Sequence, residues 1–217
     1  IYKGKRLTVQ STGIGPDNID IVFNELDALV NVNLETREIK ENHTALNIVR
    51  IGTSGSLQAD IPVDSWVMSK YAIGLDNMLR SYLIEEHSVA ELEDAFIAQT
   101  NWDLRKGRPT VVPCAEALEN KIYSDKFHKG FTGTAGGFYG PQGRVVRLNI
   151  QDPQLNSKMD AFNFNGTRMT NLEMETSAIY GLGKLLGHNC LSLNAIIANR
   201  AVGEFSSNPE KTVNELI

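Results

Sequence analysis

The chain has 217 residues, a formal net charge of -5 at pH 7 and a sequence pI near 5.4. Its 41% hydrophobic and 22% charged residues are usual for a globular domain, and the length allows one sizeable core. The acidic balance argues against an extended nucleic-acid-binding surface, and no apolar run reaches the roughly 18 residues of a membrane span. We therefore expect a single domain over residues 1–217, with neither nucleic acid nor a membrane as its partner.

Cysteine and histidine usage narrows the chemistry further. Cys114 and Cys190 lie far apart in the sequence, so they form neither a disulfide framework nor a metal knuckle. The four histidines are scattered without the spacing of metal ligands, and we predict no metal. These features fit a reducing compartment, and we expect a cytoplasmic protein.

The first predicted elements are a short strand over residues 7–10 and a helix that begins at Pro16. Apolar residues of this helix recur at three- and four-residue spacing from Ile19 to Val30, which gives it one face for packing. Residues 46–51 form the next predicted strand, broken by the glycine-containing residues 52–55. Together these elements predict a β-α-β unit with parallel strands.

The later elements continue the alternation of strands and helices, which predicts an α/β sheet covered on both faces. Residues 101–113 are polar, basic and poorly patterned, and we interpret them as a loop near the site entrance. The other predicted elements are a strand over 62–68, a helix over 89–98, a glycine-dense segment over 136–144, a helix from about 173 and a buried strand over 191–198.

The segment Glu173-Met174-Glu175 sets two carboxylates around a methionine, just before a predicted helix. Carboxylates are costly to bury, so this pair suggests a wall that receives hydroxyl groups, such as those of a sugar. The alternative is a solvated first helical turn, where acidic residues suit the positive end of the helix dipole.

The run Arg50-Ile51-Gly52-Thr53-Ser54-Gly55 places an arginine at a strand end, followed by hydroxyls and flexible backbone. Ligands of parallel α/β sheets gather at the carboxyl ends of strands. The Arg50 guanidinium matches phosphate oxygens, and Thr53 adds a hydroxyl, so this run predicts an oxyanion site. An ordinary glycine-rich strand exit is the alternative.

A third segment, from Phe138 to Arg144, combines an aromatic ring, an amide and a guanidinium. Phe138 suits stacking on a planar ring, while Gln142 both donates and accepts hydrogen bonds. Arg144 suits a ring carbonyl that gains negative charge. The combination predicts a pyrimidine site, and a simple Gly-Pro-Gln-Gly turn is the alternative.

Residues 11–15, the three segments above and Asn199-Arg200, taken in their order along the chain, resemble the nucleoside phosphorylase-I family. The resemblance covers nearly the whole chain and is strongest to the uridine phosphorylase branch. The resemblance implies a single-domain, three-layer α/β/α fold with a central mixed, largely parallel twisted sheet. It implies a pentosyltransferase of pyrimidine salvage in which orthophosphate, as co-substrate, displaces the base by reversible phosphorolysis, without a cofactor.

The resemblance also assigns roles by residue. Arg50, Glu175, Gln142 and Arg144 would be catalytic. The phosphate contacts would be Arg50 and Thr53; the ribose contacts Thr53, Glu173, Met174 and Glu175; the base contacts Ser54, Gly55, Phe138, Gln142 and Arg144.

Asn199-Arg200 occupies the place where purine-cleaving and hydrolytic relatives carry an Asp that protonates a purine, which favours a pyrimidine. A purine nucleoside phosphorylase or nucleosidase of the same fold, or a nucleoside-binding protein without turnover, are the alternatives. The resemblance implies a homodimer or hexamer whose sites are completed by a neighbouring subunit. The family's glycine-rich phosphate loop would precede residue 1, so we expect that an N-terminal segment is lacking.

Overall fold

The computed structural model describes residues 3–217. Among these residues, no helix is long and apolar enough to cross a membrane. The helices are α1 (Pro16–Asn31), α2 (Ala90–Thr100), α3 (Glu116–Ile122), α4 (Leu155–Ala161), α5 (Thr176–Leu185) and α6 (Pro209–Leu216), and short 3-10 turns are η1 (Met78–Ser81), η2 (Ile84–Glu86), η3 (Leu104–Lys106) and η4 (Gly140–Gln142). The strands are β1 (Val32–Asn33), β2 (Glu38–Ile39), β3 (Asn47–Ser56), β4 (Trp66–Gly74), β5 (Thr110–Pro113), β6 (Phe127–Thr134), β7 (Asn163–Phe164), β8 (Thr167–Glu173), β9 (Asn189–Asn199) and β10 (Glu204–Phe205).

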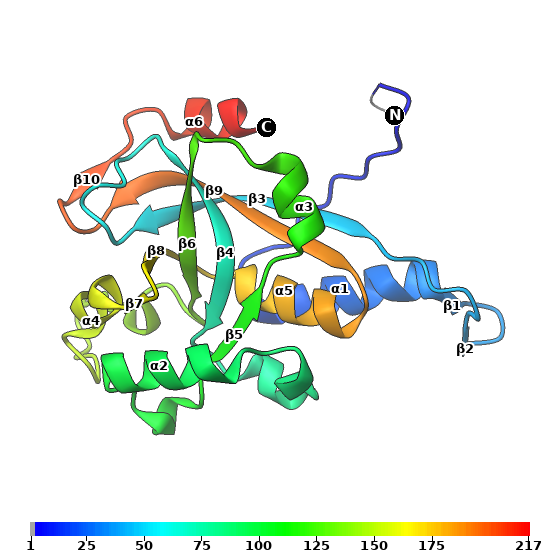
Figure 1. The fold of residues 1–217 in the computed structure, drawn as a ribbon, viewed down its shortest axis with the longest axis horizontal. Coiled ribbons are helices and arrows are strands. Elements are labelled where there is room, and N and C mark those ends of the chain that lie inside the picture. The colour runs from blue at the N-terminus through cyan, green and yellow to red at the C-terminus, as the bar shows by residue number, and fades with distance from the viewer. Residues whose placement is uncertain (1–2) are drawn as a thin grey trace.

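The central sheet is mixed and closes on itself. Strands β9, β3, β8, β6 and β4 pair in that order, and β4 also pairs with β9, which completes a circuit of strands (Figure 1). The longest pairings, β3 with β9 and β4 with β6, are parallel, and β6 with β8 is parallel as well. The short closing pairs β4–β9 and β3–β8 are antiparallel. A mixed, largely parallel sheet was predicted and is confirmed; its closure was not predicted.

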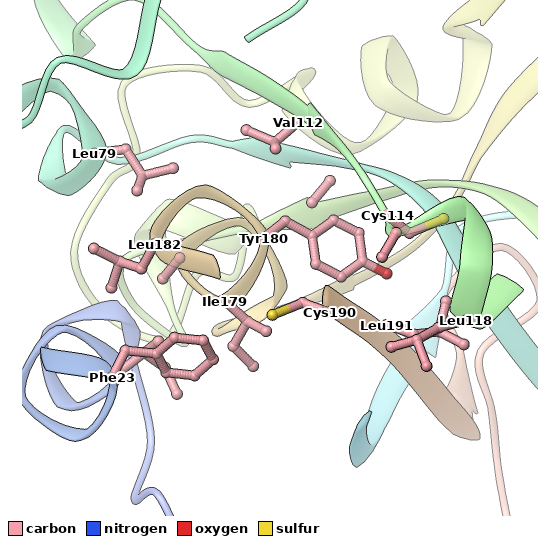
Figure 2. Close-up of a cluster of buried hydrophobic side chains, with 14 of the residues drawn as sticks. Phe23, Leu79, Val112, Cys114, Leu118, Ile179, Tyr180, Leu182, Cys190 and Leu191 are labelled. Carbon is pink, nitrogen blue, oxygen red and sulfur yellow. The ribbon is translucent and has the colours of Figure 1, made fainter. Parts of the chain in front are cut away.

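Two apolar clusters hold the helices against the sheet. One lies under α1, α3 and α5, where Phe23 and Tyr180 meet residues of β4, β5 and β9 (Figure 2). The other lies under α2 and α4, where the Phe96 and Phe131 rings each lie near Phe162, with centroid distances of 5.1 and 5.2 Å. The α/β fold with helices on both sides of the sheet is therefore confirmed.

The predicted strand over residues 7–10 is wrong, and the predicted β-α-β unit fails with it. These residues belong to no strand, and the Leu7 and Val9 side chains are exposed. An extended segment becomes a strand only when a neighbour accepts its backbone hydrogen bonds, and no such neighbour pairs with residues 7–10 among the described residues. The parallel partner of β3 is instead β9, near the end of the chain.

Other boundaries differ from the predictions in instructive ways. The helix at Pro16, the helix near residues 89–98 and the final buried strand are confirmed as α1, α2 and β9. The strand predicted over 62–68 is β4, which begins at Trp66. Residues 52–55 do not break β3, because their backbone continues to pair with β9 across one register shift. Residues 101–113 are not wholly loop, since β5 adds antiparallel to β4.

Candidate active site

The closed circuit of strands encloses polar side chains that bond to one another. Asn194 donates to Ser69 Oγ (3.1 Å), and the hydroxyls of Ser69 and Thr132 are 2.6 Å apart. Thr132 donates to Asn171 Oδ1 (2.8 Å), and Asn171 in turn donates to Ser54 Oγ (2.8 Å). All five residues are buried. A satisfied network of this kind holds its members in fixed orientations.

Arg50 of β3 extends from this network towards the start of α5. One guanidinium nitrogen donates to Asn194 Oδ1 (2.9 Å) and, at 3.4 Å, to Ser192 Oγ. The other lies 2.6 Å from a carboxylate oxygen of Glu175 and 3.3 Å from one of Glu173. We call Arg50, Glu173 and Glu175 the arginine–carboxylate group.

Glu173 ends β8 and is buried, with 4% of its surface exposed. One oxygen accepts from Thr134 Oγ1 (2.6 Å), and the other accepts the backbone N–H groups of Glu175 (2.8 Å) and Thr176 (2.9 Å). Burial raises the pKa of Glu173, against the opposing effect of the Arg50 guanidinium. The interpretation of a solvated helical turn is therefore wrong.

Glu175 occupies the N-cap position of α5 and is 8% exposed. Its Oε1 accepts the N–H of Gly15, 2.9 Å away, at the N-cap of α1. Gly15 has a φ of 102°, and a Cβ there would lie 2.7 Å from an Asp17 oxygen, so the turn requires glycine. The sequence predicted a turn at residues 11–15 but not this contact. Met174, between the two glutamates, is half-buried.

A second group lies on the irregular segment that follows β6. Arg144 donates to Gln142 Oε1 (2.7 Å) and to the Phe138 carbonyl (2.5 Å). Its guanidinium carbon lies 3.8 Å from the centre of the Phe138 ring, which is 52% exposed. Arg200 also donates to Gln142 Oε1 and, at 2.9 Å, to the Gln142 carbonyl. We call Gln142, Arg144 and Arg200 the glutamine–arginine group.

Arg200 is the functional candidate whose position the sequence did not reveal. Its Nε lies 3.1 Å from where a Cβ of Gly55 would stand, so only a very small residue at position 55 leaves it room. Burial, followed by the nearby charge of Arg144, lowers the pKa of Arg200 to about 10. The sequence signal that could have identified Arg200 is its place directly after a predicted buried strand. Asn199 faces elsewhere and donates to the carbonyls of Gln58 and Ile61.

The predicted residues thus fall mainly into the arginine–carboxylate group and the glutamine–arginine group. Strands β3 and β8 carry several of them. Ser54 lies four residues beyond Arg50 on β3, and it is bonded to Asn171, two residues before Glu173 on β8. The Thr53 side chain is exposed and makes no hydrogen bond with the described residues. Strand alternation directs its side chain away from the face that carries Arg50 and Ser54. Thr53 is therefore not among the residues that contact the Arg50 guanidinium.

A cavity of about 710 Å³ lies beside the glutamine–arginine group and has Arg144 in its wall. Arg50 and Glu175 do not line this cavity. This cavity therefore does not join the three predicted segments.

Within residues 3–217, one cluster offers possible metal ligands: Asp27, His43 and His188, whose ligand atoms lie within 4.8 Å of one another. The Leu46 N–H donates to His188 Nδ1 (3.3 Å), which leaves Nε2 as the protonated nitrogen, 3.3 Å from Asp27. A protonated nitrogen does not bind a cation, so we interpret the contact as a buried His–Asp pair. The absence of a metal stays a prediction.

Comparison with known proteins identifies the family of the chain. Residues 1–216 match the sequence profile described as "Phosphorylase superfamily". The chain is 28% identical to a uridine phosphorylase of Thermococcus kodakarensis, over 97% of the chain and 64% of that protein's length. It is 27% identical to a DeoD-type purine nucleoside phosphorylase of Bacillus cereus, over 100% of the chain and 74% of that protein. The chain thus spans somewhat less than two thirds of the first relative.

Two solved structures share the fold. A Trypanosoma brucei nucleoside phosphorylase described as showing uridine phosphorylase activity superposes with a TM-score of 0.78 at 26% identity, covering 94% of this chain and 75% of that one. A study of two Phytophthora capsici uridine phosphorylases provides a second, with a TM-score of 0.57 at 21% identity, covering 93% and 68%. The resemblance to nucleoside phosphorylases drawn from the sequence is confirmed at the level of the family. The chain belongs to the phosphorylase superfamily.

Proposed function

We propose that the protein is a pyrimidine nucleoside phosphorylase, specifically a uridine phosphorylase that converts uridine and orthophosphate to uracil and ribose 1-phosphate. The observation that carries the proposal is the half-buried Arg50, which lies directly against Glu175 and Glu173. The proposal includes a cytoplasmic homodimer or hexamer with sites completed by a neighbouring subunit. It includes neither a cofactor nor a metal, and orthophosphate is a co-substrate.

In the proposed reaction, a phosphate oxygen bonds to the anomeric carbon as the bond from that carbon to the base breaks. The sugar gains positive charge in the transition state, and Glu175 would hold the ribose hydroxyls and favour that charge. Arg50 would hold the phosphate beneath the sugar, since a guanidinium offers paired donors to phosphate oxygens. Its bonds to Asn194 and Ser192 would keep it oriented.

The departing base takes the electron pair of the broken bond, and its ring becomes negative. Gln142 and Arg144 would bind the polar edge of uracil and stabilise that charge, with Phe138 stacked on the ring. Arg200 acts through Gln142, because it donates to both the side-chain and main-chain oxygens of that residue. With two arginines on Oε1, the Gln142 amide is held in one orientation, with its NH₂ free to donate.

Purine nucleosides are the second candidate substrates, because a purine nucleoside phosphorylase is among the relatives. A purine leaving group needs a proton on a ring nitrogen, and an acidic residue after the last long strand would supply it. Asn199 and Arg200 stand there instead; Asn199 bonds to backbone carbonyls and Arg200 to Gln142. These contacts support the pyrimidine assignment.

The proposal is tested by incubating the purified protein with uridine, deoxyuridine, thymidine and inosine, each with and without orthophosphate. We expect uracil and ribose 1-phosphate to appear in equal amounts from uridine, and only when phosphate is present. Inosine should react at least a hundredfold more slowly.

Three other outcomes would each indicate a different function. Base release without phosphate indicates a nucleosidase, and faster cleavage of inosine indicates a purine phosphorylase. Uridine binding in calorimetry without any turnover indicates a nucleoside-binding protein. Any of these three results refutes the proposal.

A further inference from the structure

The cavity of about 710 Å³ adjoins the glutamine–arginine group and shares only Arg144 with it. Its wall is formed by the segment around Trp102 and by the chain from Tyr139 to Leu155. Of the residues expected to bind the base, only Arg144 lines it; Phe138, Gln142 and Gly55 do not. Its volume lies within the range of about 300–1,000 Å³ that is typical of small-molecule sites. This cavity adjoins the expected base site and has a different lining.

The wall joins flat apolar surfaces to positive charge. Trp102 and Tyr139 supply aromatic rings, and Leu148 is an exposed aliphatic residue in the same wall. Lys106 lies with its Nζ 4.8 Å from the centre of the Trp102 ring. Because ammonium groups and aromatic faces attract one another, this contact keeps the charge beside the apolar surface. An aromatic ligand would find both in one place.

The wall carries more positive than negative charge, with three cationic side chains and one carboxylate. Within residues 3–217, Lys106, Arg144 and Arg147 form no ion pair with a carboxylate. The carboxylate of the wall, Asp152, lies 2.9 Å from Lys158 and is paired with that residue. Three cations around an apolar hollow favour a negatively charged occupant.

We infer that this cavity is a binding site for a small flat aromatic anion, a class that includes aromatic sulfonates, aromatic carboxylates and phosphorylated heterocycles. The ring lies against Trp102 and Tyr139, and the anionic group meets Lys106, Arg144 and Arg147. Since Arg144 also bonds to Gln142, an anion that draws it into the cavity weakens the hold on that amide. This second consequence, weaker uridine binding, rests on the proposed function.

The first test measures binding alone, with 1-anilinonaphthalene-8-sulfonate as the aromatic anion and fluorescence as the readout. The full chain should bind one equivalent saturably, and the neutral analogue N-phenyl-1-naphthylamine at least tenfold more weakly. The double substitution Lys106→Ala with Arg147→Ala should weaken binding of the sulfonate at least tenfold. The matched control is Arg105→Ala, an exposed arginine of the same 3-10 turn that pairs with Asp103 outside the cavity.

Equal binding of the charged and neutral probes refutes the anion site. So does unchanged sulfonate affinity in the double variant, or an equal loss in the Arg105→Ala control. Arg147 is exposed and forms no side-chain hydrogen bond or ion pair with residues 3–217, so its replacement is not expected to disturb folding. Circular dichroism of each variant verifies this.

The second test measures uridine phosphorolysis with and without saturating sulfonate. We expect the KM for uridine to rise about tenfold at nearly constant kcat, and the rise to disappear in Arg147→Ala, which alone leaves the basal KM unchanged. If uridine is cleaved but its KM does not change, the coupling through Arg144 is refuted. If the probe binds but uridine is not cleaved, the proposed function fails and the anion site stands.

Discussion

The arginine–carboxylate group and the glutamine–arginine group are built in opposite ways. In the first, both glutamates are buried and Arg50 is half-buried, and its members come from β3, the end of β8 and the start of α5. In the second, Gln142 and Arg144 belong to an irregular segment beside the half-exposed Phe138. Regular elements hold side chains more precisely than loops do, while loops vary more readily. Under the proposed function, the sugar and phosphate contacts would rest on rigid structure, and the choice of base on variable structure.

The largest expected effect is that of Glu175→Ala. We expect kcat/KM to fall at least about a hundredfold for every nucleoside that the enzyme cleaves, because the residue acts on the sugar that all of them share. Steady-state phosphorolysis on the nucleoside panel measures this. Glu91→Ala, on the exposed side of α2, should leave kcat/KM unchanged. A loss limited to one base would break the distinction between the two groups.

Arg144→Ala should lower kcat/KM nearly as much as Glu175→Ala does, but by different factors for different nucleosides. We expect about a hundredfold lower kcat/KM for uridine and a smaller loss for inosine, so the ratio of the two rates changes. Competition assays with both nucleosides in one tube measure that ratio directly. An equal loss for both substrates would show that Arg144 does not select the base.

Arg200 should act as a positioning residue, with an intermediate effect. Arg200→Ala leaves Gln142 free to turn, and we expect the KM for uridine to rise about tenfold with a smaller change in kcat. Arg200→Lys should restore part of this, since a lysine supplies one of the two lost donors. If kcat falls while KM is unchanged, the residue has another role.

Thr134→Val tests how firmly the buried group is held. The substitution keeps the shape but leaves an oxygen of Glu173 without its hydroxyl donor, and Ser177 N–H without its acceptor. We expect the free energy of unfolding to drop by about 2 kcal/mol, as for buried groups left unpaired. Thr134→Ser is the control and should lose much less. Urea unfolding followed by circular dichroism measures both.

The smallest effect is a pH dependence from Cys190, which lies beneath α5. Burial raises the pKa of its thiol to about 12. Because the unfolded thiol ionises near its ordinary pKa of 9, the unfolded state loses this proton first, and the stability conferred below pH 9 is lost as the pH rises towards 12. At pH 10 the loss should be about 1 kcal/mol, and Cys190→Ala should remove it. Urea unfolding at pH 8 and pH 10 measures the difference.

Local patterns predicted α1, α2, β3, β4 and β9, because the spacing of apolar residues reflects which face of an element is buried. They missed β6, β8, α3 and α4. They did not predict pairing partners. The Gly15 N–H and the Glu175 carboxylate are 160 positions apart, and nothing near either residue indicates the other. Residues 7–10 show the same limit in reverse: they have a strand-like composition but no strand beside them.

For the site residues too, local patterns predicted burial but not contacts between distant parts of the chain. Glu173-Met174-Glu175 was predicted as a carboxylate wall because acidic residues adjoined an apolar run, and both glutamates are buried. Thr53 was assigned to the phosphate from its neighbours in sequence, yet strand alternation sends it to the other face of β3. The contact of Arg200 with Gln142 spans 58 positions, so only the folded chain reveals it.

Under the proposed function, the direct pairing of Arg50 with Glu175 would couple the binding of the two substrates. The two charges satisfy each other, so a nucleoside that arrives first would compete with the guanidinium for the carboxylate. Orthophosphate bound to the arginine would release the carboxylate for the ribose hydroxyls. Thermodynamic linkage makes this preference mutual, so each substrate should tighten the other's binding by the same factor.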